Sequence, residues 1–208
     1  MARRFLTVAD LEGLEEGAEL TLGSGCELTD WAREEADRRG LRIKRAPAGE
    51  APPLPRAPLP RLAIASDHGG WELKQALTPW LREQGYAVAD LGPAEPQTVD
   101  YPDQAARVAE AVRAGQAQLG IVIDAAGIGS AMAANKLPGI RAAMCYDRAT
   151  ARNSRAHNHA NLLTLGGRLL SPELAREIVW TWLTTAPEGG RHAARVEKIA
   201  ALERKKTE

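Results

Sequence analysis

From residue 61 onward, short apolar runs alternate with amphipathic segments, and this alternation limits the chain to few folds. Five runs have the length of buried strands, and they lie at 62–65, 86–89, 119–123, 141–146 and 162–165. Segments with apolar residues at helical spacing lie at about 70–84, 103–114, 130–136, 148–156, 172–184 and 189–204. Strands that alternate with helices favour a parallel sheet covered by helices on both faces. We therefore predict an α/β domain.

A proline-rich segment divides this domain from a smaller one. Residues 46–60 contain six of the 13 prolines and little periodic hydrophobicity, which predicts an extended, semi-rigid linker. The segment separates an N-terminal module, residues 1–45, from the larger domain, residues 61–208. A module of about 45 residues is marginal for a core of its own. We therefore expect it to dock onto the main domain, a partner or another copy of itself.

The N-terminal module has the pattern of a small α/β unit. Its expected elements are a helix starting at 7–10, a strand at 19–22, a helix from the cap Thr29 through Asp37 that Gly40 terminates, and a strand at 41–43. The segment 28–36 resembles a short module that precedes some enzymes of bacterial microcompartments. That resemblance implies an assembly role, through contact with a shell or cargo protein. The alternative is a docking appendage with another purpose.

Charge and composition argue against several classes of partner. Lysine plus arginine and aspartate plus glutamate balance at 27 each, so no net field favours nucleic acid or an anionic membrane. The five tryptophans are spread along the chain, and no run approaches the roughly 18–20 apolar residues of a membrane span. Cys26 and Cys145 form no CxxC pattern, and the first residues lack the apolar stretch of a signal peptide. We expect a cytoplasmic protein without nucleic-acid or membrane partners.

Polar residues follow two of the predicted strands at the point where each strand ends. The first strand leads into Asp67 and His68, and the third leads into Asp124 and the glycine-containing segment 127–130. Ligands of parallel α/β sheets bind beyond the carboxyl ends of the strands. Glycines there let backbone N–H groups face a cavity, although a tight turn without a ligand would have the same sequence. The segment matches neither a Walker A loop nor a complete GxGxxG motif, which disfavours a nucleotide.

Six ordered sequence blocks give the larger domain a resemblance to a known family. The blocks are ASDHGG at 65–70, VDYP at 99–102, GIGSAMAANK at 127–136, SRAHN at 154–158, LGGR at 165–168 and EGGRHAAR at 188–195. In this order they resemble the type B ribose-5-phosphate isomerases, a family that includes the galactose-6-phosphate isomerase subunits. The resemblance covers essentially residues 61–205. It implies a Rossmann-like fold and a homodimer, or a tetramer, with active sites assembled from two subunits.

The reaction that this resemblance implies needs a base and an oxyanion site. Moving a carbonyl between C1 and C2 takes a proton from one carbon and returns one to its neighbour. We assign the base role to Asp124 and the oxyanion donors to the amides of 127–130, with no metal or organic cofactor. The alternative is that Asp124 only caps the turn. Many members of the family carry cysteine at position 124, others carry glutamate in place of Ser130, and a frequent loop hydroxyl is replaced here by Ala126.

The resemblance also implies roles for residues outside that loop. His157, with Asn158, matches the pair that opens the sugar ring, and Ser130 is a further catalytic candidate. The expected substrate-binding residues are Asp67, His68, Tyr101, Gly127, Ile128, Gly129, Asn158, Arg168, Arg191 and Arg195. The three arginines would grip a phosphate, although a solvated basic face has the same spacing. A metal pair of His157 and His159 is not expected, because no further ligand cluster accompanies it.

Three functions are compatible with these features. The leading hypothesis is a ribose-5-phosphate/ribulose-5-phosphate isomerase of pentose phosphate metabolism. The second is an isomerase of another aldose phosphate, such as a tetrose or hexose phosphate. The third is a catalytically silent subunit that binds sugar phosphates or serves assembly. Against it argue the retained Asp67, His68, His157, Asn158 and the three arginines.

Overall fold

The computed structural model describes residues 4–6, 8–11, 13–23, 26–45 and 59–204. The chain divides into two compact units, Met1–Leu59 and Pro60–Glu208, and each is described by itself. The predicted linker at 46–60 lies almost entirely outside the described residues. No helix in the described part of the chain is both long and apolar enough to cross a bilayer.

The first unit is a small α/β fold with two pairs of parallel strands. Its elements are β1 (Arg4–Leu6), the 3-10 helix η1 (Val8–Leu11), β2 (Glu19–Leu22), β3 (Cys26–Leu28), α1 (Asp30–Arg38) and β4 (Arg42–Arg45). Strand β1 pairs with β3, and β2 pairs with β4. The unit has a small apolar core of its own, which includes Leu11, Leu20, Leu22, Ala32 and Ala36.

Most of the helices and strands predicted for this unit are confirmed, and one is wrong. The strand at 19–22 is β2, the strand predicted at 41–43 is β4, and Thr29 caps α1 by accepting a bond from the Ala32 amide at 3.2 Å. The helix predicted from 7–10 is only the four-residue η1. Gly13 follows it at φ +87°, a left-handed conformation that turns the chain away before an α-helical turn can form.

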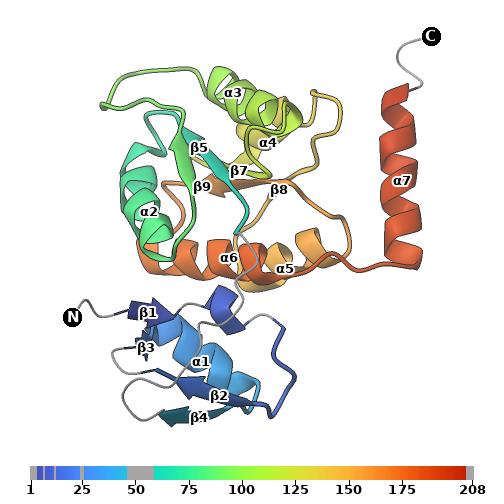
Figure 1. Cartoon of the computed structure of the whole chain (residues 1–208). Helices are drawn as coiled ribbons and strands as arrows, with labels where there is room; N and C mark the ends of the chain where they lie inside the picture. The colour runs from blue at the N-terminus through green and yellow to red at the C-terminus, as the bar shows by residue number, and fades with distance from the viewer. Residues whose placement is uncertain (1–3, 7, 12, 24–25, 46–58, 205–208) are drawn as a thin grey trace. The chain divides into compact units, whose positions relative to one another are not determined.

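The second unit contains the predicted five-stranded parallel sheet, in the order β6-β5-β7-β9-β8. The strands are β5 (Leu62–Ser66), β6 (Val88–Asp90), β7 (Leu119–Asp124), β8 (Ala142–Met144) and β9 (Leu162–Gly166). The helices are α2 (Trp71–Glu83), α3 (Tyr101–Arg113), α4 (Ile128–Ala134), α5 (Arg148–Ala156), α6 (Pro172–Thr184) and α7 (Arg191–Arg204). Helices α3 and α4 cover one face of the sheet, while α2, α5 and α6 cover the other (Figure 1).

Two predicted strands are shorter than their apolar runs. The run at 86–89 becomes a strand only from Val88, because the Tyr86 amide still donates to Leu81 of α2, at 3.1 Å. The run at 141–146 is a strand only over Ala142–Met144, and its last residue, Tyr146, belongs to the loop before α5. In both cases the residues next to the strand serve the neighbouring helix or loop.

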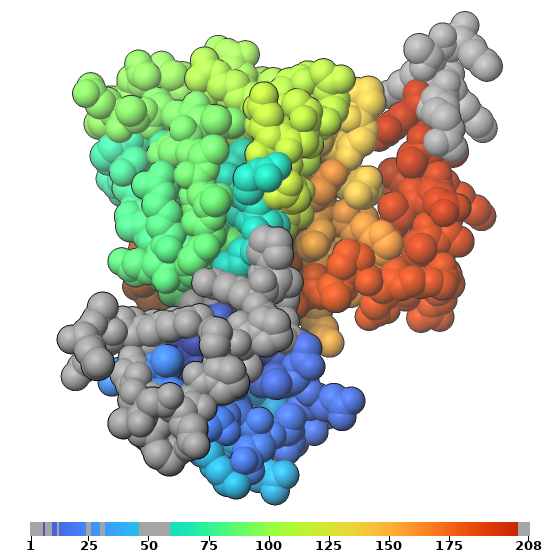
Figure 2. Space-filling view, in the orientation of Figure 1, coloured from blue at the N-terminus to red at the C-terminus, as the bar shows by residue number. Residues whose placement is uncertain are grey.

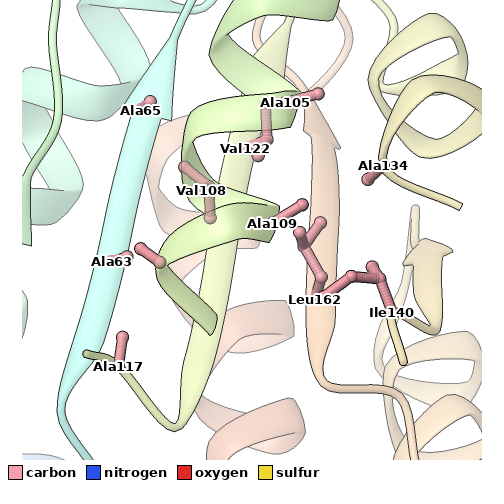
Figure 3. Packing of buried hydrophobic residues seen from close by; sticks show 11 residues of the cluster. Ala63, Ala65, Ala105, Val108, Ala109, Ala117, Val122, Ala134, Ile140 and Leu162 are labelled. Atoms are coloured by element: carbon pink, nitrogen blue, oxygen red, sulfur yellow. The ribbon is translucent and has the colours of Figure 1, made fainter. Parts of the chain in front are cut away.

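Small side chains let α3 lie close to the sheet. Ala105 and Ala109 of α3 and Ala63 of β5 are fully buried, and Figure 3 shows the small side chains of β5, β7 and α3 gathered in this layer. A Cβ atom on Gly120 of β7 would lie 2.6 Å from Cγ1 of Val108. The layer therefore depends on alanine and glycine, since larger residues would push α3 away.

The parallel sheet of the second unit has a carboxyl edge, where all its strands end, and an amino edge, where they begin. Every strand-to-helix loop lies at the carboxyl edge, and every helix-to-strand loop lies at the amino edge. Helix α6 follows β9 and returns to the amino edge, so α7 begins there and then stands beside β8 (Figure 1). A groove of about 710 Å³ separates α7 from the α4–β8 segment and is visible between the red and yellow surfaces of Figure 2.

Candidate active site

Asp124, the last residue of β7, is buried and accepts four hydrogen bonds. Its Oδ1 accepts from the amides of Ala126, at 2.7 Å, and Gly127. Its Oδ2 accepts from the amide and the hydroxyl of Ser130, at 2.9 and 2.6 Å. Two carboxylate oxygens offer about four acceptor positions. Asp124 therefore organises the loop, and it can take a proton from a ligand only after one donor moves away.

This arrangement corrects the expected oxyanion site. The amides of Gly127 and Ser130 point to the Asp124 carboxylate, so they are not available to a substrate oxygen. The amides of Ile128 and Gly129 lie in the first turn of α4, where N–H groups have no intrahelical acceptor. These two amides are the donors of the loop that a bound anion can use, and the positive end of α4 adds to the attraction.

Glycines bring three loops of the carboxyl edge into contact. A Cβ atom on Gly70 would lie 2.1 Å from the carbonyl oxygen of Ile123, and one on Gly167 would lie 2.6 Å from that of Gly69. The Gly167 amide also donates to the Asp124 carbonyl at 2.7 Å. The loops after β5, β7 and β9 are thus locked together by their backbones. They gather the predicted residues Asp67, His68, Asp124 and Arg168 at this edge.

Asp67 is a second buried carboxylate beside Asp124. Burial raises the pKa of the Asp67 carboxyl, and the charge of Asp124 raises it further. The amides of Gly70 and Gly69 oppose this by donating to the carboxylate, with the Gly70 bond at 2.9 Å. The neighbouring pair concentrates negative charge at the carboxyl edge, which suits hydroxyl recognition better than phosphate binding.

Tyr101 reaches the same site from the first turn of α3. Its ring lies against Gly129, where an added Cβ atom would be 2.4 Å from Cε2 of Tyr101.

The loop that leads to Tyr101 is anchored by Lys74, a fully buried lysine of α2. The Lys74 ammonium donates to both oxygens of Asp90, at 2.7 and 2.9 Å, and to the Pro93 carbonyl at 2.7 Å. Sequence reasoning missed Lys74, although a lysine on an apolar helix face was the available signal.

A second cluster of predicted residues lies at the amino edge. His157 ends α5, and its ring stacks on that of His192 in α7, with centroids 4.0 Å apart and planes within 9°. The Nε2 atoms of both histidines lie 3.6 Å from Oε2 of Glu188. Burial lowers the pKa of His192, and His157 and then Arg191 lower it further, while Glu188 acts in the opposite direction. Sequence reasoning did not foresee His192 or Glu188 as partners of His157.

Contrary to the prediction, further possible metal ligands do lie beside His157, although His159 is not among them. Ligand atoms of His157, Glu188 and His192 all lie within 4.8 Å of one another, while His159 faces the Glu188 carbonyl at 2.7 Å. An imidazole binds an ion in its ring plane. Because the rings of His157 and His192 are nearly parallel, one ion cannot lie in both planes without tilting them. The geometry is that of a stacked pair bridged by a carboxylate.

The two clusters are separated by the length of the sheet. Asp67, His68, Tyr101, Asp124 and Arg168 follow the carboxyl ends of strands or begin the next helix. The residues at the amino edge are His157, Asn158, Arg191 and Arg195. A strand of six residues, such as β7, spans about 20 Å. One copy of the chain therefore does not bring the two predicted halves of the site together.

Comparisons with known proteins agree with the predicted resemblance. The Ribose/Galactose Isomerase family model matches residues 62–199. The chain is 42% identical over 146 residues to ribose-5-phosphate isomerase B of Escherichia coli, covering 70% of this chain and 98% of that protein. It is 40% identical over 144 residues to D-erythrulose-4-phosphate isomerase of Pectobacterium atrosepticum, covering 68% and 94%. The solved structure of ribose-5-phosphate isomerase B of Clostridium thermocellum is similar, with TM-score 0.69, 50% identity and coverage of 70% and 98%.

Proposed function

Because this chain belongs to the Ribose/Galactose Isomerase family, and is a sugar-phosphate aldose–ketose isomerase, we propose that it interconverts ribose 5-phosphate and ribulose 5-phosphate without a cofactor. The observation that carries the proposal is the Asp124–Ser130 pair beside the Ile128 and Gly129 amides. The pair offers a base for the carbon-bound proton, and the amides offer donors for the oxygen that becomes charged. Two relatives that carry the ribose-5-phosphate isomerase name support this choice of substrate.

The Asp124–Ser130 pair suggests how the base is released. When the Ser130 hydroxyl turns to a sugar oxygen, Oδ2 of Asp124 loses one of its two donors. That oxygen then takes the proton from C2 of the aldose and returns it to C1. Between the two steps, the Ile128 and Gly129 amides hold the enediolate oxygen. Asp67 and His68, at the same edge, are assigned to the sugar hydroxyls.

The amino-edge cluster completes the site in a second copy of the chain. His157, with Asn158, is assigned to opening the sugar ring, and Arg191 and Arg195 are assigned to the phosphate. Because these residues lie a strand length from Asp124, a neighbouring copy must supply them. Exposed apolar side chains support such an interface, since Leu202, which lines the groove, is 61% exposed and Met132 of α4 is 64% exposed. We propose a homodimer as the smallest active assembly, and a tetramer would preserve the same sites.

The first unit is proposed to serve assembly rather than chemistry. It has a core of its own, and no residue of the predicted site belongs to it. Contact with a microcompartment shell or cargo protein is one form of that role, within an enzyme of the cytoplasm. Removal of residues 1–58 is expected to leave kcat and KM unchanged, as measured on the purified second unit beside the full chain. A loss of turnover with an intact fold would give the first unit a part in catalysis.

A tetrose phosphate is the second candidate substrate. The relative from Pectobacterium atrosepticum, named for D-erythrulose 4-phosphate, is nearly as similar as the one from Escherichia coli. The test is a comparison of kcat/KM for tetrose, pentose and hexose phosphates, with and without a chelator. We expect the highest value for ribose 5-phosphate and no effect of the chelator. A higher value for a tetrose phosphate would replace the proposed substrate, and no turnover of any sugar would favour a silent binding subunit.

A further inference from the structure

Interconverting an aldose and a ketose moves a proton between oxygens as well as between carbons. While a base carries hydrogen from C2 to C1, the hydroxyl proton on O2 must leave and a proton must reach O1. Asp124 is committed to the carbon-bound proton in the proposed reaction. The oxygen step calls for a group that donates and accepts in the same geometry, which a hydroxyl does.

Hydroxyl groups at the carboxyl edge differ in their burial and in their hydrogen-bond partners. Ser66 is fully buried at the end of β5, and the Ser130 hydroxyl, which donates to Asp124 at 2.6 Å, is already assigned to releasing the base. The loop residues Ala125 and Ala126 carry no hydroxyl. Tyr146 follows β8 at the same edge, is 36% exposed, and directs its hydroxyl to the Ala126 carbonyl at 3.2 Å.

The contacts of the Tyr146 hydroxyl are weak enough to be exchanged for a ligand. Its distance to the Ala126 oxygen, 3.2 Å, exceeds the 2.7–2.8 Å or so that is usual for an O–H donor. Its other partner is the Met144 sulfur, at 3.0 Å, and a thioether is a poor acceptor. A sugar oxygen would therefore be a better partner than either of the present ones.

Ala126 joins this hydroxyl to the proposed base. The Ala126 amide donates to Oδ1 of Asp124 at 2.7 Å, and the carbonyl of the same residue accepts from Tyr146. Asp124 and Tyr146 are thus both hydrogen-bonded to Ala126, which belongs to a loop held in place by close packing against glycines.

We propose that Tyr146 is a further catalytic residue, whose phenol transfers the proton between O2 and O1. As Asp124 takes the proton from C2, Tyr146 donates its hydroxyl proton to O1 and accepts the proton of O2. One O–H bond breaks and one forms at the phenol, which ends the step protonated and neutral. This inference rests on the proposed isomerase function and adds to it a hydroxyl for the transfer between the two oxygens.

The test first removes the hydroxyl at position 146 and then introduces one at position 126. Tyr146→Phe removes only the phenol oxygen, and we expect kcat to fall by about 10²-fold, since acid–base groups contribute about 10² or more. We expect KM and Tm to stay near the values of the unchanged protein. Tyr86→Phe is the control, because it makes the same change at a buried tyrosine on the α2–β6 connection. In the Tyr146→Phe background, Ala126→Ser should restore part of kcat.

The outcomes separate a proton relay from a structural contact. If Tyr146→Phe keeps the kcat of the unchanged protein, or raises only KM, the assignment of Tyr146 is overturned. A fall in kcat together with a lower Tm, not relieved by Ala126→Ser, overturns it as well. Kinetics are measured with whichever sugar phosphate the unchanged protein converts fastest. Absence of any turnover by the unchanged protein instead removes the proposed function itself, and Tyr146 with it.

Discussion

The two edges of the second unit hold their candidate site residues in different ways. At the carboxyl edge, Asp124 is 4% exposed and is bound by three amides and a hydroxyl of its own loop. At the amino edge, His157 is held by side chains alone, through the stack on His192 and a contact with Asn153 at 2.9 Å. The first half-site is preorganised by the backbone. The second is partly open, as the proposed contact with another copy requires.

Replacing the buried carboxylate should have the largest effect, because it removes both the base and the loop's acceptor. Asp124→Asn is expected to lower kcat by about 10³-fold or more, since it affects proton transfer and electrostatic positioning together. Inorganic phosphate should still bind, as the assigned arginines lie at the other edge. Asp103→Asn changes an exposed carboxylate of α3 and serves as the control. Activity within about tenfold of the unchanged protein would mean that another group is the base.

Replacing His157 at the amino edge should lower kcat only for sugars whose ring must open before the reaction. His157→Ala is expected to lower kcat for ribose 5-phosphate by about 10²-fold. A tetrose 4-phosphate has no free O4 with which to close a furanose ring, so its conversion should be nearly unaffected. Steady-state kinetics on both sugars measure the difference. Equal losses on the two sugars would contradict ring opening and leave His157 a general binding residue.

The buried Asp67 carboxyl should make the stability of the protein slightly dependent on pH. Its pKa is raised in the folded protein, so the native state binds the proton more tightly than the unfolded chain does. Stability is therefore reduced above the folded pKa, recovers as the pH falls through that pKa, and is fully restored below the ordinary pKa of aspartate. Asp67→Asn should raise Tm slightly at neutral pH, while lowering activity. Thermal melts at several pH values test this, and a lower Tm at neutral pH would contradict it.

The sequence predicted the sheet well because its strands are buried on both faces. Runs such as 62–65 and 119–123 are apolar throughout, and they appear as β5 and β7. The three-residue strands β1 and β3 of the first unit were not predicted, because three residues are too few to show the alternation of apolar and polar side chains that marks a strand. The helix predicted near 7–10 failed for a similar reason, because a short apolar segment does not distinguish an α-helix from a 3-10 turn.

The candidate residues could be chosen from the sequence, but their partners could not. The order of the motifs pointed to Asp124 and Ser130. Only the structure shows that the Gly127 and Ser130 amides donate hydrogen bonds to the Asp124 carboxylate. The buried bonds of Lys74 depend on a loop nearly 20 residues further on, which no local pattern predicts. The separation of the two edges was implicit in the strand-and-helix order, since α5 must return to the amino edge before β9.

A mixed assembly of two inactive variants tests most directly that a site joins the two edges of different copies. Asp124→Asn and His157→Ala chains are coexpressed with different tags, and hybrids carrying both tags are assayed with ribose 5-phosphate. Each hybrid dimer then holds one intact and one doubly altered site, so it should show about half the activity of the unchanged dimer. If hybrids are no more active than the two parent variants, each site lies within a single chain, contrary to the proposed assembly.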